Sequence, residues 1–281
     1  MSAVINTNIA TLNAQRNASA SQMSLGVAMQ RLSSGLRVNS AKDDAAGLAI
    51  AERMNAQVRG MQVAIRNAND GISMSQTAEG ALAKVGDALQ RMRELAVQSR
   101  NGTNSDTDKN SLNKEFAELQ SEIKRVLGGT AFNGKKILGA DGTSFTFQVG
   151  ANTTADDSIT VDFENMVSNA DVSAVTVNTA TIGSTADASA IASVIGDIDT
   201  ALDTINDKRA TFGATQSRFD AVISNLQVAV ENQSAARSRI VDADFAQETA
   251  NLSRAQILQQ AGNAMIAQAN QLPQLVLRLL Q

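Results

Sequence analysis

The chain has 281 residues and a net charge of −4, and it contains no cysteine, histidine, tryptophan or tyrosine. This composition excludes a Ser-His-Asp triad, a thiol nucleophile and zinc finger or zincin sites, and 3% aromatic residues are too few to line a sugar cleft for a two-carboxylate glycosidase. The acidic balance argues against nucleic-acid binding. Because the residue types that most enzymes use are missing, we expect a non-enzymatic protein with no catalytic residue, cofactor or metal.

The first predicted segment, residues 1–39, is a thin amphipathic helix and a linker. Its apolar residues recur at near-helical steps, but the stripe buries too little by itself to offset about 1–2 kcal/mol of backbone entropy per residue. The first 25 residues lack the basic head and apolar core of a signal peptide, so any export is expected to proceed without a cleaved leader. No apolar run approaches the length of a membrane span.

Residues 40–166 are predicted to form rod helices followed by β-hairpins. Ser40 and Asp43 have capping-box spacing, which predicts a helix start. A heptad rhythm from Met54 to Ala96, weakened only around residues 75–79, then predicts a rod of about 80 Å. A second helix is expected over residues 107–127. Alternating residues around Phe145 and Val161 predict one or two hairpins.

Residues 167–189 are predicted to be a short, variable surface linker. The stretch from residue 166 to 187 has almost no charge and reads as a loop on the outside. Its hydroxyl groups are candidate O-glycosylation sites, with an unmodified loop as the equal alternative. The candidates are Ser168, Ser173, Thr176, Thr179, Thr181 and Ser184.

The chain ends in a second rod helix, residues 190–241, and a terminal helix, residues 242–281, that Pro273 is expected to bend or interrupt. The predicted fold is mainly α, with long antiparallel coiled-coil rods, a small β-hairpin region and both termini paired at one end. The two terminal stripes then lack a partner within the subunit, which predicts self-assembly. The assembly candidates are Ile5, Ile9, Leu12, Leu32, Leu36, Ile257, Leu258, Met265, Leu272 and Leu279.

Three motifs come close to known sites. Residues 129–135 match the start of a Walker A loop, but Lys136 stands where Ser or Thr is needed, so a helix end turning into a hairpin is favoured. Asp106, Asp108 and Asn110 open a calcium-loop pattern that lacks its glycine and its final glutamate, so a helix cap is favoured. The carboxylates of Asp156, Asp157 and Glu164 are the remaining candidates for a glycan-acting enzyme.

Four longer motifs resemble the terminal hallmarks of bacterial flagellins. At the N-terminal side these are Leu32–Ile50, LSSGLRVNSAKDDAAGLAI, and Ala68–Leu82, ANDGISMSQTAEGAL. At the C-terminal side they are Ser238–Glu248, SRIVDADFAQE, and Ser253–Gly262, SRAQILQQAG. The likeness covers about residues 1–166 and 191–281, and several independent motifs occur in the family's order.

The resemblance implies a short flagellin without large outer domains. Such subunits stack head-to-tail into an extracellular filament used for swimming, after type III export through the flagellum. The partners implied are further copies of the chain, an export chaperone, the cap and the hook-junction proteins. A junction protein of the flagellum, present in few copies, is the alternative.

The segment around Arg91 also resembles the part of flagellins that the flagellin-sensing Toll-like receptor of vertebrates reads on free subunits. The matching positions are Arg91, Leu95, Gln98 and Glu115. Physical reasoning alone favours a solvated rod face, whereas the resemblance implies a receptor contact. Because these residues lie on a rod, the receptor site is expected to overlap surface that neighbouring subunits cover.

Overall fold

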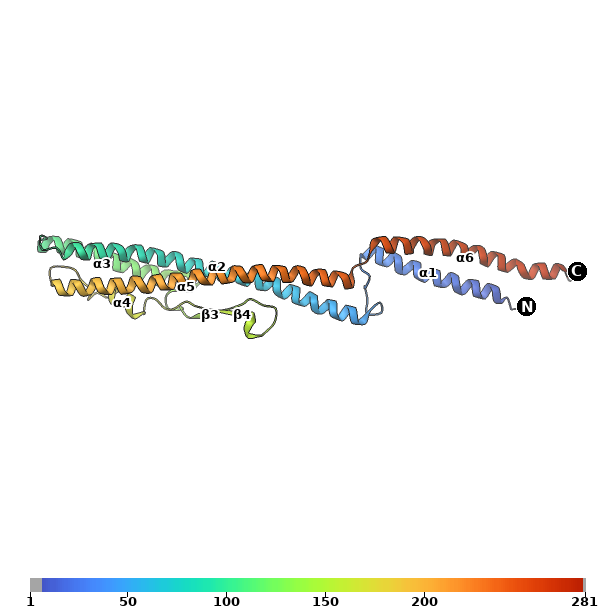
Figure 1. The fold of residues 1–281 in the computed structure, drawn as a ribbon, viewed down its shortest axis with the longest axis horizontal. Coiled ribbons are helices and arrows are strands. Elements are labelled where there is room, and N and C mark those ends of the chain that lie inside the picture. The colour runs from blue at the N-terminus through green and yellow to red at the C-terminus, as the bar shows by residue number, and fades with distance from the viewer. Residues whose placement is uncertain (1–6, 280–281) are drawn as a thin grey trace. The chain divides into compact units, whose positions relative to one another are not determined.

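The computed structural model describes residues 7–279, with side chains up to residue 271. The described chain is mainly helical and carries two small antiparallel sheets (Figure 1). It divides into two compact units, residues up to 56 together with residues from 231 onward, and residues 57–230. The helices are α1 (Ile9–Ser34), α2 (Ala45–Ser99), α3 (Asp106–Gly129), α4 (Ala170–Thr176), α5 (Ala188–Val241) and α6 (Phe245–Leu279).

In the first unit, α1 and α6 form an antiparallel pair. The side-chain amide of Asn8 caps α1 by accepting from the Thr11 N–H, and it also donates to the Ala269 carbonyl at 2.7 Å. At the other end of α1, Arg31 bonds to Glu248 at 3.1 Å. The start of α1 thus contacts the later part of α6, and the end of α1 contacts the start of α6. The two helices are therefore antiparallel, which confirms the prediction that the terminal helices pair. Helix α6 continues through Pro273 to Leu279, so the proline does not interrupt it.

The segments that follow α1 and precede α6 are hydrogen-bonded to each other. Leu36 and Asp242 form an isolated antiparallel bridge, and the Ala243 N–H donates to the Gly35 carbonyl at 2.9 Å. Gly35 has a φ of 72°, a left-handed conformation that glycine adopts without a Cβ penalty, and this residue ends α1. These bonds hold the segment after α1 and the segment before α6 together, at the point where α1 ends and α6 begins.

The helix start predicted at Ser40 lies a few residues further along the chain. The Asp43 carboxylate accepts hydrogen bonds from the Ser40 hydroxyl and N–H, which lower the pKa of Asp43 and close a separate turn. The cap of α2 is instead Asp44, whose carboxylate accepts from the Gly47 N–H at 2.8 Å. Two adjacent aspartates follow Ser40, and the capping-box spacing alone did not distinguish between them.

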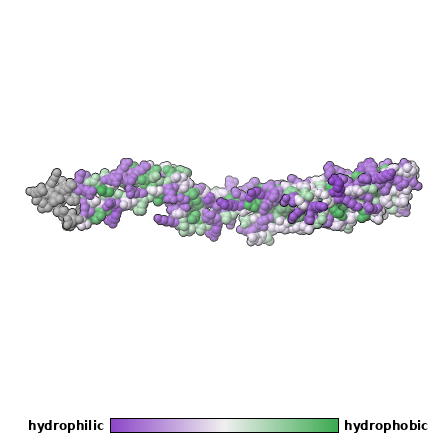
Figure 2. Space-filling view, turned by 180° about the vertical axis from the view of Figure 1, so that it is seen from behind, coloured by the Kyte–Doolittle hydropathy of each residue, from purple (hydrophilic) through white to green (hydrophobic). Residues whose placement is uncertain are grey.

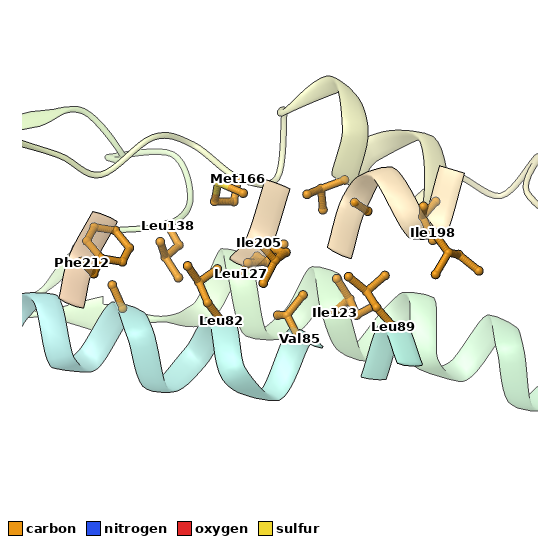
Figure 3. Close-up of a cluster of buried hydrophobic side chains, with 14 of the residues drawn as sticks. Leu82, Val85, Leu89, Ile123, Leu127, Leu138, Met166, Ile198, Ile205 and Phe212 are labelled. Carbon is orange, nitrogen blue, oxygen red and sulfur yellow. The ribbon is translucent and has the colours of Figure 1, made fainter. Parts of the chain in front are cut away.

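In the second unit, α2 and α5 run antiparallel and enclose one hydrophobic core with α3. Arg93 pairs with Asp199 at 2.6 Å and Arg209 with Glu79 at 3.2 Å, which fixes the direction of the pair. The predicted heptad stripe is confirmed as the core seam, part of which is shown in Figure 3. The fully buried residues of this core include Leu82, Val85, Leu89, Ile123, Leu127, Leu138, Ile198, Ile205 and Phe212.

Helix α2 stays intact through residues 75–79, where the heptad rhythm weakens. Ser75 is fully buried there, and its hydroxyl donates to the Gly71 carbonyl at 2.8 Å, so the polar group is satisfied within the helix. Gly71 has a second role, because a Cβ at this position would lie 2.7 Å from the Phe219 ring of α5. Its missing side chain therefore lets the aromatic ring pack directly against the backbone of α2.

The Walker-like segment is a helix end and a tight hairpin, as predicted. Helix α3 ends at Gly129, β1 (Ala131–Phe132) pairs with β2 (Lys135–Lys136), and Asn133 and Gly134 form the turn with φ values of 47° and 79°. Asparagine followed by glycine is the preferred pair for such two-residue turns, because both positions need positive φ. The backbone N–H of Lys136 donates to the Asp141 carboxylate at 2.9 Å.

The second predicted hairpin is β3 (Ser144–Gln148) paired with β4 (Ser158–Asp162). Phe145 lies opposite Val161 and Phe147 opposite Ile159, so the apolar residues of both strands share one face. The ring of Phe147 packs edge-on against Phe219 of α5, with centroids 5.5 Å apart. The hairpin therefore attaches to the rod through aromatic contacts.

The loop expected on the outside over residues 166–187 is partly wrong. It contains the short helix α4, and Val172, Val175 and Ile182 are fully buried in the core. The Gln120 amide of α3 donates to the carbonyls of Val175 and Ala180 at 2.8 and 3.0 Å. Low charge in this segment reflects burial of small aliphatic side chains, which composition alone did not distinguish from an uncharged loop.

Lys208 joins α5 to the end of β4. Its ammonium lies 2.7 Å from the Glu164 carboxylate and 3.9 Å from that of Asp162. The hydrogen bond from Lys208 lowers the pKa of Glu164, and the same bond raises the pKa of Lys208. The pair therefore contributes to stability at pH values above the ordinary pKa of a glutamate side chain. This contribution is lost as the pH falls through the lowered pKa of Glu164, and it is also lost as the pH rises through the raised pKa of Lys208.

We expect Lys208→Met to lower the free energy of unfolding by about 1 kcal/mol near neutral pH, because the methionine keeps the apolar packing but loses the ion pair. Urea denaturation during stepwise acidification should show this difference shrinking as Glu164 becomes protonated. The matched control is Lys84→Met, whose partner Asp87 is mostly exposed, and it should leave stability unchanged. A deficit that persists after Glu164 is protonated would show that packing, and not charge, is the cause.

Candidate functional site

The surface of the α1–α6 pair carries large apolar side chains in contact with solvent. Ile9 is 66% exposed, Ile257 65% and Met265 61%. Single exposed apolar residues are common, whereas several large ones on the same pair of helices are typical of an interaction surface. Figure 2 shows the apolar residues, in green, lying among hydrophilic ones on the face drawn there. By the term apolar face we mean this set of exposed residues on the two helices, namely Ile9, Leu12, Met23, Val27, Met29, Ile257, Leu258 and Met265. Within the set, the helical spacing turns Met29 away from the side of α1 that carries Met23 and Val27.

The structure places the ten assembly candidates as follows. Leu12 and Leu258 are about half exposed, like the three residues above, whereas Leu32 and Leu36 are only partly exposed. Ile5 lies outside the described residues, as do the side chains of Leu272 and Leu279. Of the candidates that the structure describes, five are therefore exposed on α1 or α6, and Leu32 and Leu36 are only partly accessible to solvent.

A groove of about 810 Å³ runs between α1 and α6. Met23 and Val27 line it from α1, and Leu258 lines it from α6, so its apolar part belongs to the apolar face. Sequence reasoning missed Met23 and Val27, and it placed Met29 in the N-terminal apolar stripe without counting it among the assembly candidates. The four-residue step from Met23 to Val27 was a usable signal, because residues four apart lie on the same side of a helix.

The polar end of the groove is closed by the ion pair between Arg31 and Glu248. The Glu248 side chain is only 9% exposed, and it also accepts from the Asn251 amide at 3.4 Å. Such a buried pair fixes the register of two helices, because a one-turn slip would leave an unpaired charge. Further along the pair, a Cβ at Gly262 would lie 3.5 Å from the Ala18 Cβ, so small residues let the helices approach closely.

The predicted receptor residues lie on α2 and α3. The Arg91 guanidinium contacts the Glu115 carboxylate at 2.9 Å and that of Glu94 at 2.9 Å, and the bond to Glu115 raises the pKa of Arg91. Arg91, Glu115 and Gln98 are exposed. Leu95 is 0% exposed and belongs to the core. A direct receptor contact by Leu95 therefore does not fit this structure, and its packing supports the exposed residues instead.

The six hydroxyl candidates for sugar attachment differ in access. Ser168 and Thr179 are exposed, Ser173 is partly exposed, and Thr176 is 4% exposed. The last two hydroxyls are hydrogen-bonded to α3. The bonds run from Thr181 to the Asn113 side chain at 2.8 Å and from Ser184 to the Asn110 side chain at 2.9 Å. A sugar at Thr176 would require α4 to leave the core.

The carboxylates considered for glycan chemistry serve as structural acceptors. Asp157 accepts from the Thr154 hydroxyl and N–H, and the bond from that hydroxyl lowers the pKa of Asp157. Glu164 is paired with Lys208, and Asp156 is exposed. A glycosidase needs one carboxyl with a raised pKa as its general acid. The shifts of Asp157 and Glu164 run in the opposite direction.

The calcium-like cluster is the helix cap that the sequence favoured. Ser105 caps α3, its N–H and hydroxyl donate to the Asp108 carboxylate, and the bond from the hydroxyl lowers the pKa of Asp108. Asp106 lies in the first turn of the helix, where its charge interacts favourably with the helix dipole.

Within residues 7–279, no helix is both long and apolar enough to cross a membrane.

Comparison with known proteins relates both ends of the chain to one family. Residues 5–143 match the bacterial flagellin N-terminal helical region, and residues 195–280 match the bacterial flagellin C-terminal helical region. Flagellin of Halalkalibacterium halodurans is 47% identical over 278 residues, which cover 99% of this chain and 100% of the relative. Flagellin of Bacillus subtilis is 42% identical over 306 residues, at 99% of each chain. The crystal structure of Bacillus cereus flagellin, 32% identical, aligns with a TM-score of 0.49 over 57% of this chain and 88% of its own.

Proposed function

This chain belongs to the bacterial flagellin family and is a structural subunit of the extracellular flagellar filament, and we propose that its apolar face is the surface through which subunits stack head-to-tail. The observation that carries the proposal is the set of large apolar side chains left exposed on both α1 and α6. An isolated subunit gains nothing from exposing them, whereas burial stabilises an assembly by about 25 cal/mol per Å² of apolar surface. A head-to-tail contact does not close on itself, so it generates a filament.

Purified subunit added to short filament seeds tests this role. We expect it to elongate the seeds into micrometre-long fibres at high salt, which screens charge repulsion while leaving apolar burial intact. Electron microscopy of negatively stained samples would measure fibre length. A subunit that binds only to seed ends, with no elongation, would instead support the alternative of a hook-junction protein.

We also propose the remaining partners and the route of export. An export chaperone would cover α6 before secretion, because the exposed Ile257, Leu258 and Met265 would otherwise promote association inside the cell. The cap and hook-junction proteins would contact the same terminal helices at the two ends of the filament. Export would use the flagellar type III channel. The protein would have no catalytic activity, since two of the three candidate acids, Asp157 and Glu164, are held by structural partners.

Our proposed domains follow the predicted boundaries, with residues 1–39 and 242–281 as the filament core, 40–166 and 190–241 as the rod, and 167–189 as the variable segment. The division into two compact units differs, since it separates the units within α2 and within α5, near residues 56 and 231. O-linked sugar remains a proposal mainly for Ser168 and Thr179, whose side chains are exposed.

The cluster around Arg91 is proposed as the contact for the flagellin-sensing Toll-like receptor. Its support is an exposed guanidinium held in place by two carboxylates. We expect Arg91→Asp to reduce receptor signalling about tenfold or more in a cell reporter, because three carboxylates would then repel each other at the contact. Lys84→Asp makes the same charge change on an exposed site of α2 and should leave signalling intact. Unchanged signalling by Arg91→Asp would contradict the proposal.

A further inference from the structure

The most exposed methionines of the described residues lie on the two terminal helices. Met23 is 69% exposed, Met29 56% and Met265 61%, and all three lie on α1 or α6. In residues 57–230, by contrast, Met74, Met92 and Met166 are at most 5% exposed, and Met61, like Met54 near the start of α2, is only partly exposed. The large, exposed methionines of the described chain are therefore concentrated on the apolar face.

The composition makes these sulfur atoms the main target for mild oxidants. The chain has no cysteine, tryptophan, tyrosine or histidine, which are the other side chains that such oxidants attack readily. A methionine thioether with access to solvent reacts to form a sulfoxide, and burial protects it. Oxidation should therefore occur first on α1 and α6.

We propose that Met23, Met29 and Met265 are the oxidation-sensitive residues of the free subunit, and that a peroxide switches off its assembly by converting these exposed thioethers to sulfoxides. The inference rests on the proposed role of the apolar face in subunit stacking. In the reaction, a sulfur lone pair attacks one peroxide oxygen, the O–O bond breaks and an S–O bond forms. The sulfur loses two electrons, and hydrogen peroxide is reduced to water.

The position of Met23 explains why this modification acts on assembly. Met23 lines the groove between α1 and α6 beside Val27 and opposite Leu258. A sulfoxide replaces a soft apolar atom by a strong hydrogen-bond acceptor. An acceptor buried without a donor is costly, so an oxidised subunit is a poor partner for an apolar contact. In the filament, the same methionines are covered and resist oxidation.

The test treats the full-length free subunit with hydrogen peroxide, identifies sulfoxides by peptide mass spectrometry and measures elongation of filament seeds. We expect oxidation at Met23, Met29 and Met265 first, and a fall in elongation rate of about tenfold or more with the helical circular dichroism spectrum unchanged. Methionine sulfoxide reductases should restore elongation. Filaments treated in the same way should retain unoxidised methionine at these positions.

Two variants separate the site from general damage. The triple variant M23L/M29L/M265L keeps the side-chain volume and should elongate normally before and after peroxide. The matched control M74L/M92L/M166L removes the same number of sulfurs from the core and should remain sensitive. Normal elongation by wild-type subunit carrying all three sulfoxides would overturn the inference. If Ile257→Asp still blocks elongation in that case, the assembly role of the apolar face stands; if that variant also elongates, the assembly role itself fails.

Discussion

Ile257→Asp is expected to prevent elongation of filament seeds while the free subunit remains folded. The Ile257 side chain is 65% exposed, so the substitution removes little packing within the subunit. In an assembled contact it would lose about 1.5–3 kcal/mol of apolar burial and add the cost of a desolvated carboxylate, several kcal/mol more. Together these correspond to a loss of about a thousandfold or more in subunit affinity.

The measurement compares fibre length and the concentration of subunit left in solution after seeding. Val177→Asp is the matched control, because Val177 is 41% exposed but lies outside α1 and α6. The control should elongate like wild type. If both variants elongate normally, the apolar face is not the contact surface. If both fail, the effect comes from added charge and not from the position on α6.

Phe212→Ala is expected to cause the largest loss of stability among single changes in the second unit. Phe212, labelled in Figure 3, is 1% exposed. Its ring stacks on Phe163 with centroids 5.1 Å apart. Truncation of a buried phenylalanine leaves a cavity and costs about 3–5 kcal/mol. The contact also joins α5 to the residue that follows β4, so the loss should weaken attachment of the hairpin to the rod.

Guanidinium denaturation of the free subunit followed by circular dichroism tests this expectation. Phe245→Ala removes the same atoms from a side chain that is 57% exposed, and it should change stability by less than about 1 kcal/mol. Phe212→Leu, which refills part of the cavity, should recover part of the loss. Equal effects of the two alanine substitutions would mean that Phe212 does not hold the core together.

Periodicity sufficed to predict the rods because a heptad repeat can bury its stripe in few ways. The steps that include Leu82, Val85 and Leu89 place these residues on one side of α2 whatever surrounds it, and the structure buries all three. The turn at Asn133-Gly134 was equally local, since positive φ at both positions is a property of the residues themselves. The flagellin motifs likewise identified the family, because their order and length are specific.

Other features depended on neighbours that are distant in the sequence. From the sequence alone, the segment around Val172 and Val175 looks like an uncharged loop. In the structure, the Gln120 side chain of α3 donates hydrogen bonds to carbonyls of this segment and holds it against the core. Leu95 falls on a position that the resemblance assigns to receptor contact, yet it packs into the core. The helix cap at Asp44 required knowing which of two adjacent aspartates bonded to which backbone N–H.

The sequence by itself determined the long helices, the hairpins, the family and the exclusion of histidine and cysteine chemistry, because these follow from local periodicity, turn conformations, motifs and composition. Only the tertiary structure decided which apolar residues remain exposed. The pairing of Arg31 with Glu248 fixes the register of α1 against α6, and this register leaves Met23 and Ile257 facing solvent. Helical spacing indicated that the terminal stripes lack a partner, but the exposure of each residue depends on contacts between residues more than two hundred positions apart.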